Sequence, residues 1–386
     1  MGTGGAPGHI VNGSNQVAQL HGVNHSYTED SCTSQGGGSF ADGHLTQTDL
    51  DVMKTWKINV VRVPLNEDCW LGINGVPFGG TQYQNALKTY VNLITANGMA
   101  VILDLHWAAP GNTQSQQGVE QVSMADTDHA ITFWQQVATA YASSGSGDSS
   151  TNSMVLFDLY NEPNLGNDND ATWNCWLTGG TSCFVTNASG AQIAGSDGNP
   201  GTIAGMATML KAVRDMAAQN VVLIGGIYNA HGFTQWLSKV NSIPSVNGTS
   251  TANVIVSWHM YSNDQATCPN PWNGGIVSSN PLVCPTGAQT AANNGITAIL
   301  NAGFAVLVGE TGISADVSFL VPWFDSALSY LDQQGQSYTA WSWNVNTGPN
   351  LLTTFSYSGK CPLPTTSCSA YTTLGGQTFY QHLQKF

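Results

Sequence analysis

Short runs of apolar residues recur along the chain, and amphipathic segments lie between them. The runs predict buried strands at residues 16–23, 59–63, 100–105, 155–159, 221–224, 253–258, 305–308 and 338–343. The segments between them place apolar residues three and four positions apart, which predicts helices at residues 46–57, 83–97, 130–143, 202–219, 287–302 and 319–334. Near-continuous apolar strands that alternate with helices are typical of a parallel sheet covered on both faces.

The number of strand–helix units distinguishes between two parallel folds. Eight units predict an α/β protein with a closed (β/α)8 TIM barrel, because an open doubly wound sheet usually has fewer strands. Long segments rich in Gly, Ser and Asn follow the strands, at residues 28–41, 72–80, 111–124, 165–201 and 262–286. In a barrel these βα loops lie on one rim, which is where a binding cleft is expected.

No linker and no repeat beyond this alternation interrupts the chain. We therefore expect a single catalytic domain over residues 1–386, with its core at about residues 16–346. The remaining segment, residues 347–386, is rich in Thr, Ser and Tyr and predicts irregular structure that ends in a short helix.

Composition narrows the class of partner. Only 8% of the 386 residues are charged, and 9 Lys and Arg face 23 Asp and Glu, for a net charge of −14. A chain without a basic patch is a poor nucleic-acid binder, and a neutral or cationic ligand fits better. No apolar span reaches the length of a membrane helix. Few cations also leave many carboxylates without ion-pair partners, so we hypothesise tolerance of acidic conditions.

Eight cysteines predict a disulfide framework in a secreted protein, with buried free thiols as the alternative. Sequence alone allows 105 connectivities for eight cysteines. Proximity in the chain favours the pairs Cys175–Cys183, Cys268–Cys284 and Cys361–Cys368, which leaves Cys32–Cys69 to join the loops after the first two strands. No zinc-type spacing of Cys and His occurs, and we expect neither a metal nor a cofactor.

Two of the apolar runs end close to a glutamate. Glu162 follows the run at 155–159, and Glu310 follows the run at 305–308. The carboxyl ends of parallel barrel strands carry the chemistry of such folds, and a carboxylate pair is the minimum needed to cleave a glycosidic bond. Arg62 lies inside a third apolar strand. A buried arginine is costly unless it is paired, so we expect it to bind a carboxylate, with Glu310 as the natural candidate.

Further polar and aromatic residues follow the strands and would converge on the same rim. They are His25, His106, Trp107, Asn161, His259, Tyr261, Trp341 and Trp343. Some of them also fit structural roles: His106 and His259 as satisfied core histidines, His25 with either role, and Trp107 and Trp343 as core side chains. Four tryptophans lie in loops near candidate disulfides and are candidate sugar-stacking residues: Trp70, Trp173, Trp176 and Trp272.

Seven short motifs, in barrel order, resemble glycoside hydrolase family 5, the cellulase-type family of retaining (β/α)8 β-glycosidases. They are His-Gly-Val-Asn at 21–24, Val-Arg-Val-Pro at 61–64, Asp-Leu-His-Trp at 104–107, Asn-Glu-Pro at 161–163, His-Met-Tyr at 259–261, Gly-Glu-Thr-Gly at 309–312 and Trp-Ser-Trp at 341–343. The resemblance extends from the first strand to the eighth, and so over nearly the whole chain.

The resemblance implies a role for each matching residue. Glu162 would be the general acid/base and Glu310 the nucleophile that forms a covalent glycosyl-enzyme. Tyr261 would stabilise the charge of Glu310, and Asn161 would bind the sugar 2-hydroxyl. Trp341 would stack under the sugar at the cleavage site. The other substrate-binding candidates are Arg62, His106, His259, His25, Trp107 and Trp343.

The function we expect is that of a secreted, monomeric endo-β-1,4-glucanase acting on an oligo- or polysaccharide. An exo-acting β-glycosidase or disaccharide-glycoside hydrolase is the second possibility, and a β-mannanase the third. The loops at 165–201 and 262–286 would decide among them. A carbohydrate-binding barrel without activity is the non-enzymatic alternative, although both glutamates are present.

Overall fold

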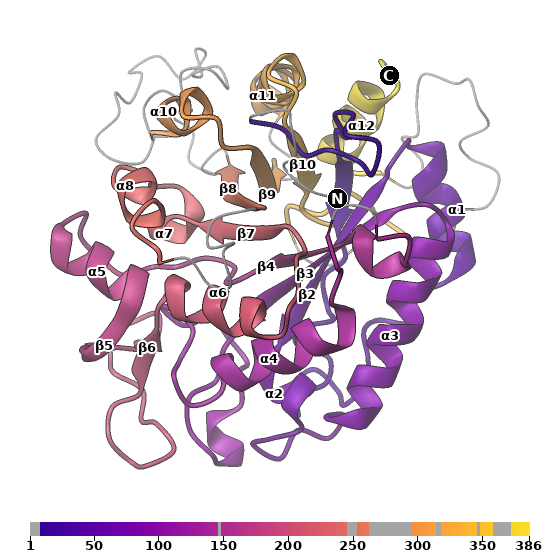
Figure 1. Cartoon of the computed structure of the whole chain (residues 1–386). Coiled ribbons are helices and arrows are strands. Elements are labelled where there is room, and N and C mark those ends of the chain that lie inside the picture. Colours follow the sequence, from indigo (N-terminus) through magenta and orange to yellow (C-terminus); the bar gives the residue numbers. More distant parts are fainter. Residues whose placement is uncertain are drawn as a thin grey trace.

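The computed structural model describes residues 8–145, 148–244, 253–261, 295–313, 318–345, 348–357 and 372–386. Within these residues, eight strands form a closed parallel barrel (Figure 1). They are β1 (His21–Asn24), β2 (Val60–Asn66), β3 (Ala100–Trp107), β4 (Val155–Asp158), β7 (Val222–Gly225), β8 (Val254–Tyr261), β9 (Val306–Gly312) and β10 (Ser337–Ala340). The barrel closes because β1 pairs with both β2 and β10. The predicted fold class is confirmed, and a strand lies at each of the eight predicted places. Two predicted bounds are wrong, because β1 begins at His21 instead of residue 16 and β10 ends at Ala340 instead of residue 343.

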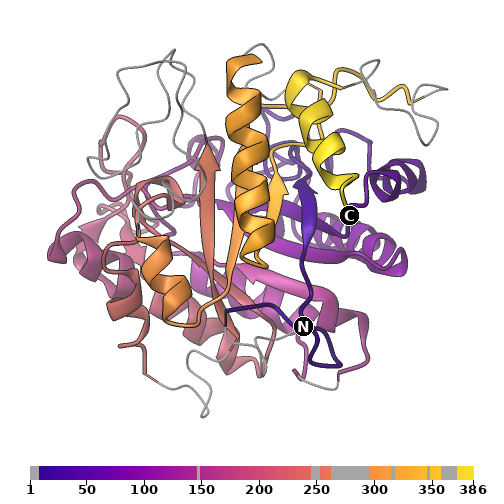
Figure 2. The same cartoon turned by 90° about the horizontal axis from the view of Figure 1, so that it is seen from above.

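Helices surround the barrel, and α11 and α12 lie side by side along one flank of it (Figure 2). The helices are α1 (Gln47–Thr55), α2 (Glu67–Leu71), α3 (Thr81–Ala96), α4 (Ala130–Tyr141), α5 (Asp170–Thr178), α6 (Met206–Asp215), α7 (Ile227–Ala230), α8 (Trp236–Val240), α10 (Ile296–Asn301), α11 (Val321–Gln333) and α12 (Leu374–Leu383). The short helix expected at the end of the chain is α12. None of the described helices is long and apolar enough to cross a membrane.

The predicted helix at 202–219 is wrong in its first turn. Residues Thr202–Ala204 form a short strand, β6, which pairs antiparallel with β5 (Gly179–Phe184). Gly205 precedes the helix with an extended backbone, so α6 starts only at Met206. Of the predicted helix at 287–302, residues 296–301 form α10, and its first part lies outside the described residues.

Alternation along the strands sorts side chains into two separate cores. The core inside the barrel contains Leu20, Val60, Ala100, Ile102, Leu156, Leu223, Ile255 and Leu307. Their sequence neighbours, such as Val61, Val101 and Val256, pack in the layer between strands and helices. Two residues further along four of these strands, the same alternation points four fully buried polar residues inward: Arg62, Asp104, Asp158 and Ser257.

The register shifts in several strand pairs, and the shift between β8 and β9 lies at the candidate site. Trp258 of β8 pairs with Val308 of β9, but the next residue, His259, pairs with Glu310. Gly309 is therefore an extra residue, and such a bulge redirects the side chains that follow it. A Cβ atom on Gly309 would lie 3.1 Å from His259 Nε2, so glycine lets the two strands stay close here.

The longest described addition to the barrel follows β4. We call residues 165–201 the β4 insertion; they contain α5 and β5, and Figure 1 shows them at the outer edge of the barrel. The disulfide Cys175–Cys183 joins α5 to β5, and Cys32–Cys69 joins the segments after β1 and β2. These two predicted disulfides are confirmed. The other two predicted pairs, Cys268–Cys284 and Cys361–Cys368, lie outside the described residues.

Candidate active site

The two glutamates at the strand ends lie close together. Glu162 follows β4 and Glu310 follows the bulge in β9. A carboxylate oxygen of each, together with a ring nitrogen of His259, lie within 4.8 Å of one another. Glu162 is 18% exposed at its side chain and Glu310 only 7%. The pair is therefore partly open to solvent on the Glu162 side.

Arg62 lies below the glutamates, at the centre of an ion-pair network. Its Nη1 atom is 2.8 Å from Glu310 Oε1, as expected from the sequence. Its Nη2 atom is 3.0 Å from Asp104 Oδ2 and 3.1 Å from Asp158 Oδ2, and it also donates to Asn161 Oδ1 at 2.8 Å. The Arg62 side chain is fully buried. It cannot reach a sugar, so its assignment as a substrate-binding residue is corrected to one that positions Glu310.

One guanidinium serves three carboxylates in this network. Asp104 and Asp158 lie opposite each other in the register of β3 and β4. Each has one buried oxygen, Oδ1, without a hydrogen-bond partner in the part of the chain that the structure describes. Burial raises the pKa of both carboxyl groups, although Arg62 opposes the rise. Neither aspartate was expected at the site, because both lie within apolar strands and not beyond the strand ends. The two-residue alternation of the strands was the signal that could have found them.

Two histidines are neutral and orient their neighbours. Burial lowers the pKa of His106 to about 4 and that of His259 to about 3. His106 Nδ1 donates to Asp104 Oδ2 at 2.6 Å, and His106 Nε2 accepts from Asn161 Nδ2 at 3.3 Å. His259 Nδ1 lies 2.8 Å from Glu162 Oε1. The structure thus gives both histidines the orienting role that the sequence left open beside sugar binding.

The surroundings of the two glutamates differ. Burial raises the pKa of Glu162, with His231, His106 and Arg62 acting in the opposite direction. His231 was not among the site residues expected from the sequence, and the structure brings it into the electrostatic environment of Glu162. Tyr261 donates its hydroxyl to Glu310 Oε2 at 2.9 Å. Burial, and then the charge of Glu310, raise the pKa of Tyr261, which keeps this donor protonated.

The aromatic residues separate into two groups. Trp107 and Trp341 are partly exposed, and Trp341 lies parallel to the His106 ring with 5.4 Å between ring centroids. Trp343 is fully buried and packs on Trp56, the residue that follows α1, with ring centroids 5.0 Å apart. Trp343 therefore belongs to the core, and its predicted sugar contact is corrected.

His25 and the loop tryptophans also need correction. His25 is fully buried and lies 2.6 Å from the Tyr90 hydroxyl, so it has no surface for a substrate. Trp70, Trp173 and Trp176 are 3%, 0% and 0% exposed, and the last two lie on α5, which the sequence analysis did not predict. Trp272 lies outside the described residues.

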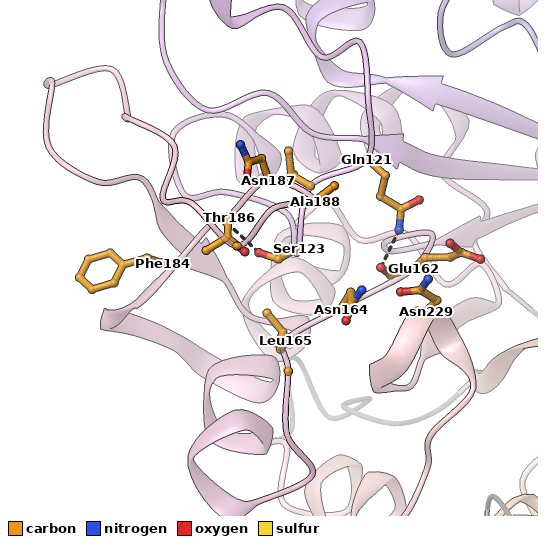
Figure 3. A pocket seen from close by; sticks show the side chains of 13 residues that line it. Gln121, Ser123, Glu162, Asn164, Leu165, Phe184, Thr186, Asn187, Ala188 and Asn229 are labelled. Atoms are coloured by element: carbon orange, nitrogen blue, oxygen red, sulfur yellow. Dashed lines mark hydrogen bonds between the residues drawn. The ribbon is translucent and has the colours of Figure 1, made fainter. Parts of the chain in front are cut away.

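A pocket of about 500 Å³ opens beside Glu162 (Figure 3). Its walls come from the loop after β3, the first residues after Glu162, the β4 insertion and Asn229. Gln121 stands next to Glu162 in this view and donates to the Glu162 backbone carbonyl at 2.7 Å. The Gln121 side chain also accepts from Asn161 Nδ2 at 3.0 Å, which fixes the Asn161 amide. The sequence predicted a role in substrate choice for the loop at 165–201, but it carried no signal for Gln121 or Asn229.

A metal ion is a possible alternative occupant of the glutamate pair. Glu162, His259 and Glu310 offer three atoms at metal-binding spacing among the described residues. The same atoms already take part in hydrogen bonds and an ion pair. His259 contacts Glu162, and both Glu310 oxygens are bonded, one to Arg62 and one to Tyr261. These contacts suit a carboxylate pair held for proton transfer and nucleophilic attack.

The closed barrel and the two adjacent glutamates define the class of (β/α)8 glycoside hydrolases. The chain belongs to glycosyl hydrolase family 5, because the family model described as "Cellulase (glycosyl hydrolase family 5)" matches residues 11–347. It is therefore a glycoside hydrolase, as the resemblance of its motifs implied.

Individual relatives are distant. A probable glucan 1,3-beta-glucosidase A of Aspergillus niger is 23% identical over 324 residues, which cover 79% of this chain and 71% of the relative. A β-glucanase of Saccharophagus degradans, solved with cellotetraose, superposes with a TM-score of 0.61 at 14% identity, over 98% of this chain and 91% of that one. The endoglucanase Cel5A of Pseudomonas stutzeri gives a TM-score of 0.56 at 19% identity, over 88% of this chain and 91% of that one. At these identities the solved structures support the fold.

Proposed function

We propose that the protein is a retaining endo-β-1,4-glucanase in which Glu310 is the nucleophile and Glu162 the general acid/base. The observation that carries this proposal is the separation of the two carboxylates, with oxygens within 4.8 Å of each other. Retaining enzymes hold the two groups about 5–5.5 Å apart, whereas inverting enzymes need about 6.5–9.5 Å to admit a water molecule.

The surroundings of each glutamate support its role. A general acid must hold its proton, and burial raises the pKa of Glu162. The neutral His259 can donate from Nδ1 to Glu162 Oε1, which leaves Oε2 for the proton that goes to the leaving oxygen. A nucleophile must carry negative charge, and Glu310 accepts hydrogen bonds from Arg62 and Tyr261.

The proposed reaction has two steps. Glu310 attacks the anomeric carbon while Glu162 gives its proton to the glycosidic oxygen, and the leaving sugar departs with that proton. Glu162, now a carboxylate, takes a proton from water, and the resulting hydroxide oxygen displaces Glu310 from the anomeric carbon. Trp341 would form the platform under the sugar at this carbon, and Asn161 would hold its 2-hydroxyl. His106 and Trp107 would complete the substrate-binding surface.

The substrate is the finer part of the proposal. Two structural relatives are a β-glucanase solved with cellotetraose and an endoglucanase, which favours a β-glucan and internal cleavage. An exo-acting β-glucosidase is the second candidate, because the curated relative is a probable glucan 1,3-beta-glucosidase. Mannanase activity stands third, since a mannanase of Streptomyces also shares the fold.

We further propose that the protein works as a secreted monomer with one catalytic domain. The Cys32–Cys69 and Cys175–Cys183 disulfides fit an oxidising compartment. The barrel and its helices account for residues from both ends of the described chain, which fits a single domain. Size-exclusion chromatography with light scattering tests the monomer.

Product analysis tests the substrate. We expect cello-oligosaccharides of four to six units to be cut internally, with manno- and laminari-oligosaccharides cut more slowly. NMR of the fresh product should show the β-anomer first, because two displacements retain configuration. Release of single glucose units from one chain end would favour the exo-acting enzyme, and initial α-product would exclude the retaining mechanism.

A further inference from the structure

The pocket beside Glu162 has a composition that points to a specific kind of ligand. Among the described residues that line it, Glu162 is the one that carries a charged group. The other polar groups are amides and hydroxyls, including Gln121, Ser123, Asn164 and Asn229. Neutral donors and acceptors suit a ligand rich in hydroxyl groups better than an ion. The volume of about 500 Å³ lies in the usual range of ligand sites.

The position of the pocket relative to the two glutamates indicates which part of a substrate it faces. It is lined by Glu162 but not by Glu310. In the mechanism proposed above, Glu162 protonates the leaving oxygen, and the sugar that is attacked lies over Glu310. We propose that this pocket binds the leaving-group sugar, with the Asn229 amide and the wall of the β4 insertion selecting it. This inference rests on the proposed function and assigns the leaving-group side of the same site.

Asn229 is held against the catalytic segment. Its backbone N–H donates to the carbonyl of Pro163, the residue after Glu162, at 2.9 Å. Its side-chain Oδ1 is buried and has no hydrogen-bond partner among the described residues. Figure 3 shows the Asn229 side chain at the same end of the pocket as Glu162. A buried carbonyl without a partner is unfavourable, and a sugar hydroxyl that donates to Oδ1 would supply the missing hydrogen bond.

The backbone around Asn229 supports a functional reason for its position. Tyr228, Asn229 and Ala230 have φ angles of 55°, 55° and 58°, three consecutive residues in the left-handed region without a glycine. Such residues persist only where the surroundings hold them, and they cluster at binding and catalytic sites. The His231 ring holds this turn through Nδ1, which lies 2.9 Å from the carbonyl oxygen of Tyr228 and 2.7 Å from that of Asn229.

The opposite wall belongs to the β4 insertion and is fixed to the barrel. Thr186 N–H donates to Ser123 Oγ at 2.9 Å, and Ser123 N–H donates to the Thr186 carbonyl at 2.8 Å. Phe184 lies at the far end of the pocket, with its ring directed away from Glu162 (Figure 3). The Cys175–Cys183 disulfide ends one residue before Phe184. The pocket therefore has a definite shape before any ligand arrives.

The test separates the leaving-group side from the rest of the reaction. A cellobiosyl fluoride with fluorine in place of the hydroxyl beside the anomeric carbon should trap the enzyme as an ester on Glu310, with fluoride released. Added cellobiose then reactivates it: its hydroxyl attacks the anomeric carbon, Glu162 takes the hydroxyl proton, and the Glu310 carboxylate leaves. The cellobiose concentration at half-maximal reactivation measures binding on the leaving-group side alone.

Two variants and one control address the pocket. Asn229→Gly removes the amide while glycine accepts the left-handed backbone, and it should raise the half-maximal cellobiose concentration five- to ten-fold. Ala188→Trp fills the pocket from an exposed position and should raise that concentration more than ten-fold. Ala191→Trp, also exposed on the insertion but not lining the pocket, should leave it unchanged.

The outcomes distinguish the two proposals. Failure of the fluoride to trap the enzyme would overturn the retaining glucanase and the leaving-group site with it. Trapping followed by the same half-maximal concentration in wild type, Asn229→Gly and Ala188→Trp would overturn the leaving-group site alone. A ten-fold rise in Ala191→Trp equal to that in Ala188→Trp would also count against it, because it would reflect a general disturbance of the insertion.

Discussion

The floor of the site, at the strand ends, and its wall, in the β4 insertion, are held in different ways. On the floor, Arg62 ties Glu310, Asp104 and Asp158 together inside the barrel, and each of these side chains is at most 7% exposed. The wall is tied down by a disulfide and by backbone bonds to Ser123, and residues 187–190 of it are partly or fully exposed. The barrel therefore fixes the two glutamates, whereas the shape of the β4 insertion that would face the leaving sugar can change without disturbing them.

Removing a glutamate tests the chemistry of the floor and should have the largest effect. Glu310→Ala should lower kcat at least about 1,000-fold, and Glu162→Ala about 100- to 10,000-fold, since general acid–base catalysis contributes that much. The Glu162 loss should shrink for an aryl cellobioside, whose good leaving group needs no proton. Initial-rate kinetics on cellotetraose and on the aryl substrate give both numbers. Near-normal activity in either variant would remove the proposed mechanism.

Replacing Arg62 tests how much its ion pairs on the floor contribute to the free energy of unfolding. Arg62→Met leaves three buried carboxylates without their cation, and breaking a buried pair on one side costs about 3–5 kcal/mol. Urea unfolding measures the loss. Lys211→Met is the matched control, because Lys211 pairs with Asp215 at the surface, where such pairs contribute about 0–1 kcal/mol. Equal losses in the two variants would contradict the network.

The two disulfides allow the same comparison in the loops. Cys32–Cys69 closes a longer stretch (37 residues apart) than Cys175–Cys183 (8 apart), so chain entropy predicts losses of about 3.8 and 2.5 kcal/mol for the serine variants. The KM for cellotetraose should rise in the Cys175/Cys183 variant, because that disulfide supports the wall. Thermal unfolding and kinetics on one preparation check both. An unchanged KM would show that the wall keeps its shape without the disulfide.

The stability of the folded protein should depend on pH in opposite directions for the carboxyl groups of the floor and of the wall. Burial raises the pKa of the floor carboxyls Asp104, Asp158 and Glu162. A raised folded-state pKa means that the folded protein holds more protons, so stability falls as pH rises through these values. Hydrogen bonds from Asn199 lower the pKa of Asp197 in the wall, which favours the opposite trend only at strongly acidic pH.

We therefore expect Tm to fall by several degrees between pH 5 and pH 8, in line with the acid tolerance hypothesised from the scarcity of Lys and Arg. Calorimetry across this range is the measurement. Asp104→Asn, which cannot ionise, should flatten the fall relative to wild type. A Tm that rises steadily to pH 8 would contradict this account of the floor.

A chelator should have the smallest effect. Arg62, Tyr261 and His259 already occupy oxygens of the two glutamates that a metal would need. Activity after prolonged EDTA treatment and dialysis should equal that of untreated enzyme. A loss that added divalent metal restores would show that the floor binds an ion.

The barrel was predictable because its strands are buried on both faces. A nearly continuous apolar run such as residues 100–105 is typical of a core strand. Eight such runs that alternate with helices predict a sheet that closes into a barrel. The glutamates and Arg62 were predictable for the same reason. A charged residue within or just after such a run is costly to bury unless it is paired or functional. The matched motifs then gave the family and the role proposed for each residue.

Other features depend on geometry that a linear pattern does not carry. Trp341 and Trp343 stand two residues apart, yet one is partly exposed and the other is packed on Trp56, because the strand ends at Ala340 and its alternation ends with it. The leaving-group pocket joins residues 121–123, 164–166, 184–190 and 229, which meet only through the path of the β4 insertion. Asn229 carries no sequence signal, since its left-handed backbone is set by its contacts.

The single extra residue in β9 has a consequence for how such an enzyme could be disarmed or could evolve. Glu310 already takes the inward position that follows Val308, because it pairs with His259 directly after the Trp258–Val308 pair. Deleting Gly309 would therefore leave Glu310 facing into the barrel, and it would remove only the redirection that the bulge gives the Glu310 side chain. One codon thus sets the aim of the proposed nucleophile, while the barrel that carries it stays the same.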